Sequence, residues 1–184
     1  DAYEVGQYVD DWGCVFENIH KGIIGEVREP IVKDWDEDWE KVRLPKEWLT
    51  LDIDAVNRAC DESDKFLLPG VVARPFERLQ FLAGSENLYM DLLDMPEGLE
   101  KFIEKMHAFY VELFTVWAKT RVDGLMFIDD WGSQGNLLVN PELWREMFKP
   151  IYKDFVDIAH SNGKKAFMHS DGHILAIYPD LVEI

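Results

Sequence analysis

The chain has 184 residues, of which 36 are acidic and 19 basic, so its formal net charge is −17. This acidic excess argues against nucleic acid and anionic membranes as partners, because such polyanions select clustered Lys and Arg. The hydrophobic fraction of 47% predicts a globular chain with a core. No apolar run reaches the roughly 18 residues of a membrane-spanning helix, and the first residues lack a signal-peptide pattern, so we expect a soluble, cytoplasmic protein.

The first fifty residues are predicted to form an extension that contains a β-hairpin. Two β-prone runs, residues 13–19 and 26–32, flank a Gly-containing turn. An acidic run with interleaved tryptophans follows over residues 34–40, and its pattern favours a solvated face over a metal site. Cys14 and Cys60 are the only cysteines and form no CxxC or CxxH pattern, so we expect two ordinary free thiols.

Residues 51–184 alternate apolar strands with amphipathic helices. Strands are expected at residues 66–73, 124–128 and 165–168. Helices are expected at residues 51–63, 75–82, 84–93, 95–122, 140–162 with a break at Pro150, and 174–183. Nearly all-apolar strands between amphipathic helices are typical of a parallel sheet with crossover helices. The sequence therefore predicts an α/β fold built from about three strand-helix units.

Polar side chains follow two of these strands, at the edge where α/β folds place their sites. Residues 129–134 (Asp-Asp-Trp-Gly-Ser-Gln) come after one strand, and residues 169–173 (His-Ser-Asp-Gly-His) end the next. Asp129 and Asp130 could serve as acid or base or bind a cation. Alternatively, one of them caps a turn while the other is solvated.

His169 and Asp171 could reach one metal ion or one substrate. An imidazole and a carboxylate suit zinc or another borderline divalent ion, yet two ligands do not make a site. A hydrogen-bonded pair that binds no metal is equally consistent with the residue types, and His173 adds only a weak HxxxH signal. The other histidines, His20, His107 and His160, are interpreted as structural or surface residues.

Several motifs are absent from the sequence. It has no Gly-rich phosphate-binding loop, no GxSxG elbow and no HExxH pattern, which disfavours phosphoryl transfer and serine hydrolysis. Arginines are few in the second part of the chain, so few guanidinium groups are available there to bind a polyanionic substrate.

The succession of motifs along the chain resembles the uroporphyrinogen decarboxylase superfamily, in particular its branch of corrinoid-dependent, zinc-using methyltransferases and decarboxylase-like proteins. The segments that carry the resemblance span nearly the whole chain: Asp11-Trp12-Gly13-Cys14, residues 84–87 with Leu92-Leu93, Asp94-Met95-Pro96-Glu97, residues 129–134, Pro150-Ile151-Tyr152-Lys153 and residues 163–172. The resemblance implies a TIM-type (β/α)₈ barrel with its active site in the loops at the strand ends.

The resemblance also implies a ligand set for zinc. In the methyltransferase branch a strand ends in His-x-Cys, and these two residues with a later cysteine hold the metal. His169 matches the histidine, whereas position 171 is Asp where that pattern has cysteine. True uroporphyrinogen decarboxylases carry an amino-terminal Arg-rich segment that binds propionates, and this chain shows none.

A complete eight-unit barrel takes about 250 residues, which is more than this chain supplies. Open parallel edges and apolar inner faces would meet water in a partial barrel. We therefore expect the chain to be an incomplete domain of a larger protein, or to cover its edges against a second copy as a homodimer.

Three functions are compatible with these patterns. The first is transfer of a methyl group between a small methylated substrate and a corrinoid protein. Its catalytic residues would be Asp129, Asp130 and His169, its metal ligands His169 and Asp171, and its substrate-binding residues Trp131, Gln134 and Ser170. The second is decarboxylation, without a metal, of uroporphyrinogen or a related carboxylate. The third is an inactive fragment or module that binds a partner.

Overall fold

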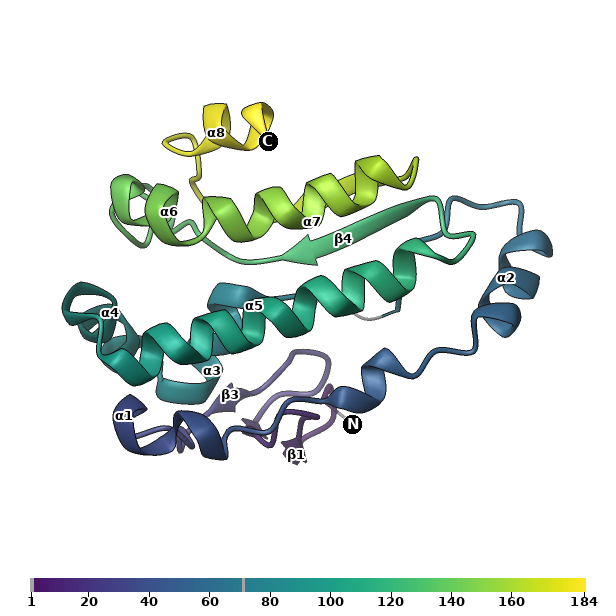
Figure 1. Ribbon diagram of the computed structural model, residues 1–184. Helices are drawn as coiled ribbons and strands as arrows, with labels where there is room; N and C mark the ends of the chain where they lie inside the picture. The colour runs from purple at the N-terminus through teal and green to yellow at the C-terminus, as the bar shows by residue number, and fades with distance from the viewer. Residues whose placement is uncertain (1, 71) are drawn as a thin grey trace. The chain divides into compact units, whose positions relative to one another are not determined.

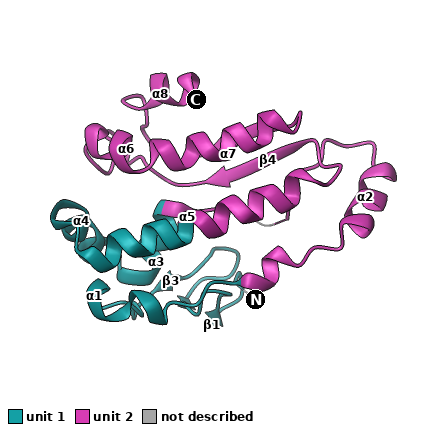
Figure 2. Ribbon diagram, viewed as in Figure 1, with its two compact units in different colours: residues 1–45, 76–106 teal, residues 46–75, 107–184 magenta. Residues whose placement is uncertain are grey.

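The computed structural model describes residues 2–70 and 72–184, and Figure 1 shows their helices and strands in chain order. The chain divides into two units, which Figure 2 distinguishes by colour. Unit 1 comprises residues 1–45 and 76–106, and unit 2 comprises residues 46–75 and 107–184. Within the described residues, no helix is both long enough and apolar enough to cross a membrane.

Unit 1 contains an antiparallel sheet whose strand order is β1-β2-β3. Its strands are β1 (Gly6–Val9), β2 (Val15–Asn18) and β3 (Glu26–Val27). The predicted hairpin is confirmed in shortened form, because β2 pairs with β3 and places Phe16 opposite Val27. Strand β1 was not predicted, and all four of its residues are exposed, so no alternation of buried and exposed positions marks it.

The helices of unit 1 bury the indole ring of Trp35. They are α1 (Trp35–Asp38), the 3₁₀ helix η1 (Trp39–Lys41), α3 (Pro75–Ala83), α4 (Ser85–Asp94) and the first part of α5 (Glu97–Ala118). Asp34 caps α1 by accepting a hydrogen bond from the backbone N–H of Asp36. Trp35 is buried with its ring 5.2 Å from that of Phe102. Trp35 of the acidic run therefore serves packing, as the sequence indicates.

A buried ion pair lies in the core of unit 1. The guanidinium of Arg78 donates to a carboxylate oxygen of Asp10, and these side chains are only 8% and 12% exposed. The other oxygen of Asp10 accepts the backbone N–H groups of Trp12 and Cys14, at 3.0 and 2.8 Å. Arg78 also lies 4.8 Å from the centre of the Trp12 ring. Burial, followed by the nearby charge of Asp10, raises the pKa of the Cys14 thiol to about 11.

Unit 2 contains a parallel pair of strands with helices between them in sequence. The strands are β4 (Gly124–Ile128) and β5 (Lys165–His169), in a register that sets Ile128 opposite His169. The helical elements are η2 (Lys46–Leu49), α2 (Ile53–Asp61), the second part of α5, α6 (Pro141–Met147), α7 (Lys149–Ser161) and α8 (Tyr178–Glu183). This is the predicted pattern of strands joined by crossover helices.

The strand predicted at residues 66–73 forms only in part. Leu67 accepts the backbone N–H of Asp123 at 2.9 Å, and Ala73 makes a parallel bridge to Phe127, so the segment runs beside β4. Pro69 lies between these contacts and has no N–H to donate, which interrupts the ladder. Val71 lies outside the described residues.

Helix boundaries in unit 2 follow their sequence signals. The side chains of Asp52 and Asn140 cap α2 and α6. Gly163, whose φ is +70°, ends α7 as predicted. Helix α8 begins at Tyr178, whereas the sequence pattern predicted a start at residue 174, and Pro179 occupies its first turn.

Aromatic rings from β4, α5 and α7 form the core of unit 2. Phe114 stacks on Phe155 at 4.4 Å, and Phe127 stacks on Tyr152 at 5.0 Å. Leu125 and Phe127 are buried, whereas Met126 and Ile128 are partly exposed on the other face of β4. Successive side chains of β4 therefore point to opposite faces, and the face that carries Phe127 packs against the aromatic rings.

Candidate functional site

Three side chains that can bind a metal converge where β4 and β5 end. Asp130 comes two residues after β4, His169 is the last residue of β5, and Asp171 comes two residues later. One ligand atom from each of the three lies within 4.8 Å of the others. His169 Nε2 lies 3.4 Å from Asp171 Oδ1 and 3.8 Å from Asp130 Oδ1. The parallel register explains this convergence, because it brings the two carboxyl ends of the strands to one edge.

The cluster is accessible to solvent and to ligands. The side chains of Asp130, His169 and Asp171 are 40%, 47% and 77% exposed. One imidazole and two carboxylates are a donor set that zinc and other borderline divalent ions accept. The backbone N–H of Asp171 donates to Asp130 Oδ1 at 2.8 Å, which fixes the orientation of that carboxylate. The three residues therefore fit a divalent cation with coordination positions left open.

The loops that carry these residues are joined through their backbones. The N–H of Asp129 donates to His169 O at 3.1 Å, and the N–H of Gly132 donates to Asp171 O at 3.2 Å. Gly132 and Gly172 approach so closely that a Cβ on Gly172 would lie 2.1 Å from the carbonyl oxygen of Gly132. Both positions therefore require glycine for the loops to meet in this way.

Asp129 and Trp131 lie in the core and not at the exposed cluster. Both are 0% exposed. Tyr152 of α7 donates its hydroxyl to Asp129 Oδ2 at 2.6 Å and accepts the indole N–H of Trp131 at 2.8 Å. Of the two adjacent aspartates, only Asp130 reaches the cluster. The sequence assigns Tyr152 no role at the site, although Tyr152 lies in one of the segments that carry the resemblance, because nothing local to α7 links it to residues more than twenty positions earlier.

The remaining predicted residues lie in the two loops. The hydroxyl oxygen of Ser170 accepts the backbone N–H of Trp131 at 3.0 Å, so this side chain links the loops. Gln134 is exposed in the loop that follows β4. His173 is also exposed, and its backbone N–H donates to Ser133 O at 2.8 Å.

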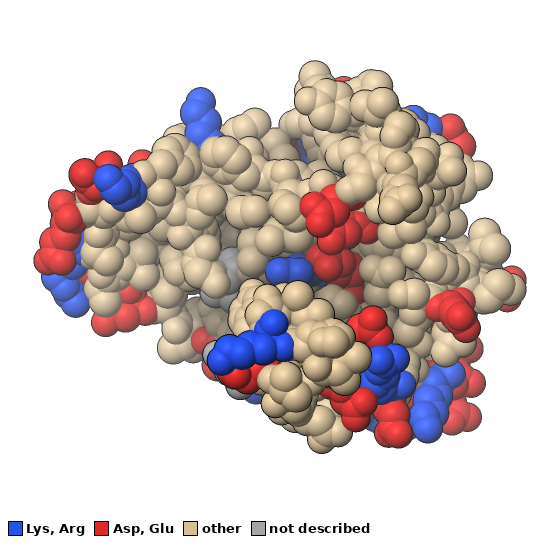
Figure 3. All heavy atoms as spheres, turned by 180° about the vertical axis from the view of Figure 1, so that it is seen from behind, with Lys and Arg blue, Asp and Glu red and all other residues tan. Residues whose placement is uncertain are grey.

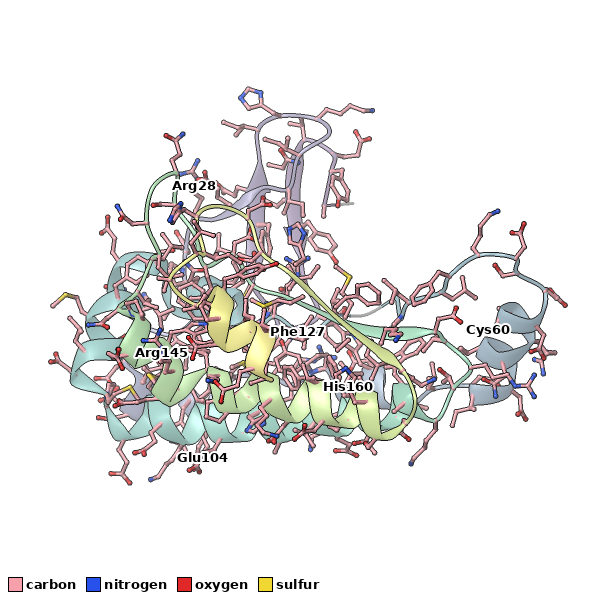
Figure 4. The ribbon with its side chains drawn as sticks, turned by 90° about the horizontal axis from the view of Figure 1, so that it is seen from above. Arg28, Cys60, Glu104, Phe127, Arg145 and His160 are labelled. Carbon is pink, nitrogen blue, oxygen red and sulfur yellow. The ribbon has the colours of Figure 1, made fainter. Side chains whose placement is uncertain are left out.

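Cys60 lies away from the cluster within unit 2. It lies on α2, and its side chain is partly exposed. Figure 4 shows Cys60 on α2 and Arg145 on α6 at opposite ends of this unit. Arg145 is paired with Asp180 and Glu142. The cluster at the carboxyl end of β5 therefore draws on imidazole and carboxylate groups and not on this thiol.

Charged side chains on the face shown in Figure 3 occur in patches, with acidic and basic groups often adjacent and uncharged surface between them. The ion pairs of the chain include Lys41 with Asp38, Lys101 with Glu97, and Lys149 with Glu183.

The family model of uroporphyrinogen decarboxylase (URO-D) matches residues 10–184. The chain belongs to the uroporphyrinogen decarboxylase family. This confirms the family that the succession of motifs indicated. A search of the curated proteins gave no match to the sequence.

Among solved structures, this member of the uroporphyrinogen decarboxylase family is similar to a methyltransferase from Methanosarcina mazei. The TM-score is 0.65 at 15% sequence identity, and the match covers 94% of this chain and 51% of that one. The chain thus spans about half the length of the methyltransferase structure. Together with the family model, the match confirms the predicted fold class, part of a (β/α)₈-type barrel.

Proposed function

We propose that this chain carries the metal-binding strand ends of a methyltransferase that uses a divalent ion such as zinc. In the whole protein, a methyl group would pass between a small methylated substrate and a corrinoid protein. The observation that carries the proposal is the convergence of His169, Asp130 and Asp171 within 4.8 Å. The similarity in fold to a methyltransferase supports the same choice within the family.

Carboxylate ligands would take the place of the cysteine that the methyltransferase pattern has at position 171. Asp171 supplies a carboxylate there, and Asp130 supplies a further oxygen ligand from the neighbouring strand end. His169, as a neutral imidazole, would bind through Nε2, the atom that faces both carboxylates. When bound, zinc supplies Lewis acidity that lowers the pKa of a thiol or of a leaving group.

The exposure of the cluster suits a bimolecular transfer. All three side chains are at least 40% exposed, so a substrate can approach them directly. The buried Asp129 cannot touch such a substrate, and it is not a catalytic residue in this proposal. Asp130 and Asp171 would hold the ion, and they would balance its positive charge so that a thiolate or a neutral methyl donor could approach.

The test is zinc binding by the chain, measured by calorimetry, with cobalt as a spectroscopic substitute. We expect His169→Ala and Asp130→Asn to lose affinity by more than the roughly 10–100-fold typical for loss of a supporting partner. His173→Ala is the matched control, because it removes an exposed imidazole four residues away and should bind as wild type. Equal affinity in wild type and His169→Ala would exclude His169 as a ligand.

Decarboxylation is the second candidate, because the family model itself describes uroporphyrinogen decarboxylase. In that case Asp130, exposed beside His169, would stabilise positive charge on a pyrrole-like ring without a metal. Turnover of uroporphyrinogen by the whole protein in the presence of a chelator would favour this reaction over methyl transfer. A whole protein with neither zinc affinity nor turnover would favour a partner-binding module.

A further inference from the structure

A chain of hydrogen bonds lies in the core directly behind the candidate site. The indole N–H of Trp131 donates to the hydroxyl oxygen of Tyr152 at 2.8 Å, and this hydroxyl donates to Asp129 Oδ2 at 2.6 Å. All three side chains are 0% exposed. One hydroxyl group on α7 thus contacts the residues immediately before and after Asp130.

This arrangement restricts the orientation of Asp130. Successive side chains of an extended segment point to opposite faces. With Asp129 and Trp131 both held on the helix-facing side, Asp130 lies on the other side, where its Oδ1 accepts the N–H of Asp171. We propose that Tyr152 is a positioning residue, whose hydroxyl fixes residues 129–131 and thereby places Asp130 against His169 and Asp171.

Packing alone does not account for a hydroxyl at this position. The ring of Tyr152 stacks on Phe127 at 5.0 Å, and a phenylalanine would fill the same space. The hydroxyl instead meets two buried polar groups, and burial of such groups is costly unless they are hydrogen-bonded. Loss of the hydroxyl is therefore expected to loosen the strand end while it leaves the aromatic core in place.

The experiment compares hydrogen exchange at the backbone amide of Asp171 in the wild type, Tyr152→Phe and Tyr110→Phe. Tyr110 is 1% exposed in the same unit and lies 6.3 Å from Phe155, so its variant removes a hydroxyl from the same core. We expect exchange at Asp171 to quicken about tenfold in Tyr152→Phe, the order expected when one hydrogen bond is lost, and to stay unchanged in Tyr110→Phe. Unchanged exchange in Tyr152→Phe, or equal acceleration in both variants, would overturn the proposal.

Asp129→Asn gives a conservative second test. The amide oxygen of asparagine can still accept the Tyr152 hydroxyl, so exchange at Asp171 should remain close to wild type. Exchange as fast as in Tyr152→Phe would mean that the hydrogen bond does not position the strand end, and would overturn the inference.

Zinc affinity offers a further test of the positioning role of Tyr152, and this test rests on the proposed function. If the wild type binds zinc, Tyr152→Phe should bind it about tenfold more weakly and Tyr110→Phe should not. Equal zinc affinity in the two variants would count against positioning. A wild type that binds no zinc would refute the proposed function alone, because amide exchange at Asp171 would still decide the role of Tyr152.

Discussion

Units 1 and 2 are built around cores of different chemistry. In unit 1, the ion pair of Asp10 and Arg78 is almost fully buried and lies against the ring of Trp12. In unit 2, stacked aromatic rings fill much of the core, and its buried polar groups have separate partners: Asp129 accepts the hydroxyl of Tyr152, whereas Lys164 donates to backbone carbonyl oxygens of residues 120 and 122. The first core contains an almost fully buried ion pair, whereas the second consists mainly of stacked rings.

The two cores should lose stability through different kinds of substitution. A buried ion pair becomes strongly unfavourable when one partner is removed, because the remaining charge has lost its compensation. Stacked rings lose stability gradually with the volume that is removed. We therefore expect single substitutions to affect unit 1 through charge and pH, and unit 2 through volume.

The largest effect is expected for Arg78→Met in unit 1. This change leaves the carboxylate of Asp10 buried without its cation and should lower the free energy of unfolding by about 3–5 kcal/mol. Urea unfolding followed by tryptophan fluorescence measures it. The double variant Asp10→Asn with Arg78→Met removes both charges and should recover much of the loss. A double variant as unstable as Arg78→Met would show that packing of the guanidinium, and not charge, is what unit 1 requires.

A smaller effect is expected from the titration of Cys14. Its pKa is raised from 9.0 to about 11 in the folded chain, so the folded state keeps a proton that the unfolded state releases first. The associated stability is complete below about pH 9 and is lost as pH rises to about 11, by about 3 kcal/mol in total.

Cys14→Ala should remove this part of the pH dependence, which urea unfolding at a series of pH values would show. In the folded wild type at pH 8, iodoacetamide should label Cys60, which is partly exposed, before Cys14, which is fully buried. Faster labelling of Cys14 would contradict the buried environment of unit 1.

The smallest effect is expected for Phe155→Leu in unit 2. This change removes part of the ring that stacks on Phe114 and should cost about 1 kcal/mol. The loss should be the same at low and high salt, since no charge is involved. A strong dependence on salt would remove the contrast between the two cores.

The sequence predicted most helices of this fold because their boundaries carry local signals. Asn140, Pro150 and Gly163 each mark a helix boundary within a few residues of where it lies. Strand β1 escaped prediction because exposed residues show no burial pattern, and Pro69 broke a strand that the apolar residues around it indicated. Local chemistry thus defines helix ends well, whereas strand pairing depends on partners that are distant in sequence.

The sequence predicted the exposed residues of the candidate site but not the buried hydrogen bonds behind them. His169, Asp171 and Asp130 follow strand ends, and that position identified them. The sequence did not show that Asp129 and Trp131 turn into the core, because adjacent residues differ in orientation only once the strand is placed against α7. Tyr152 became recognisable only through its contacts in three dimensions.

The approach of Gly132 to Gly172 has a practical consequence for engineering this site. A library that varies the two loops would lose most of its members if it included these positions, since any side chain at either one would collide with the other loop's backbone. Moving a side chain from one of these positions to the other would not rescue such variants, because neither position has room for a Cβ atom. Ser133, Gln134 and His173 are exposed beside them, so diversity placed there could change ligand preference while the two glycines keep the loops together.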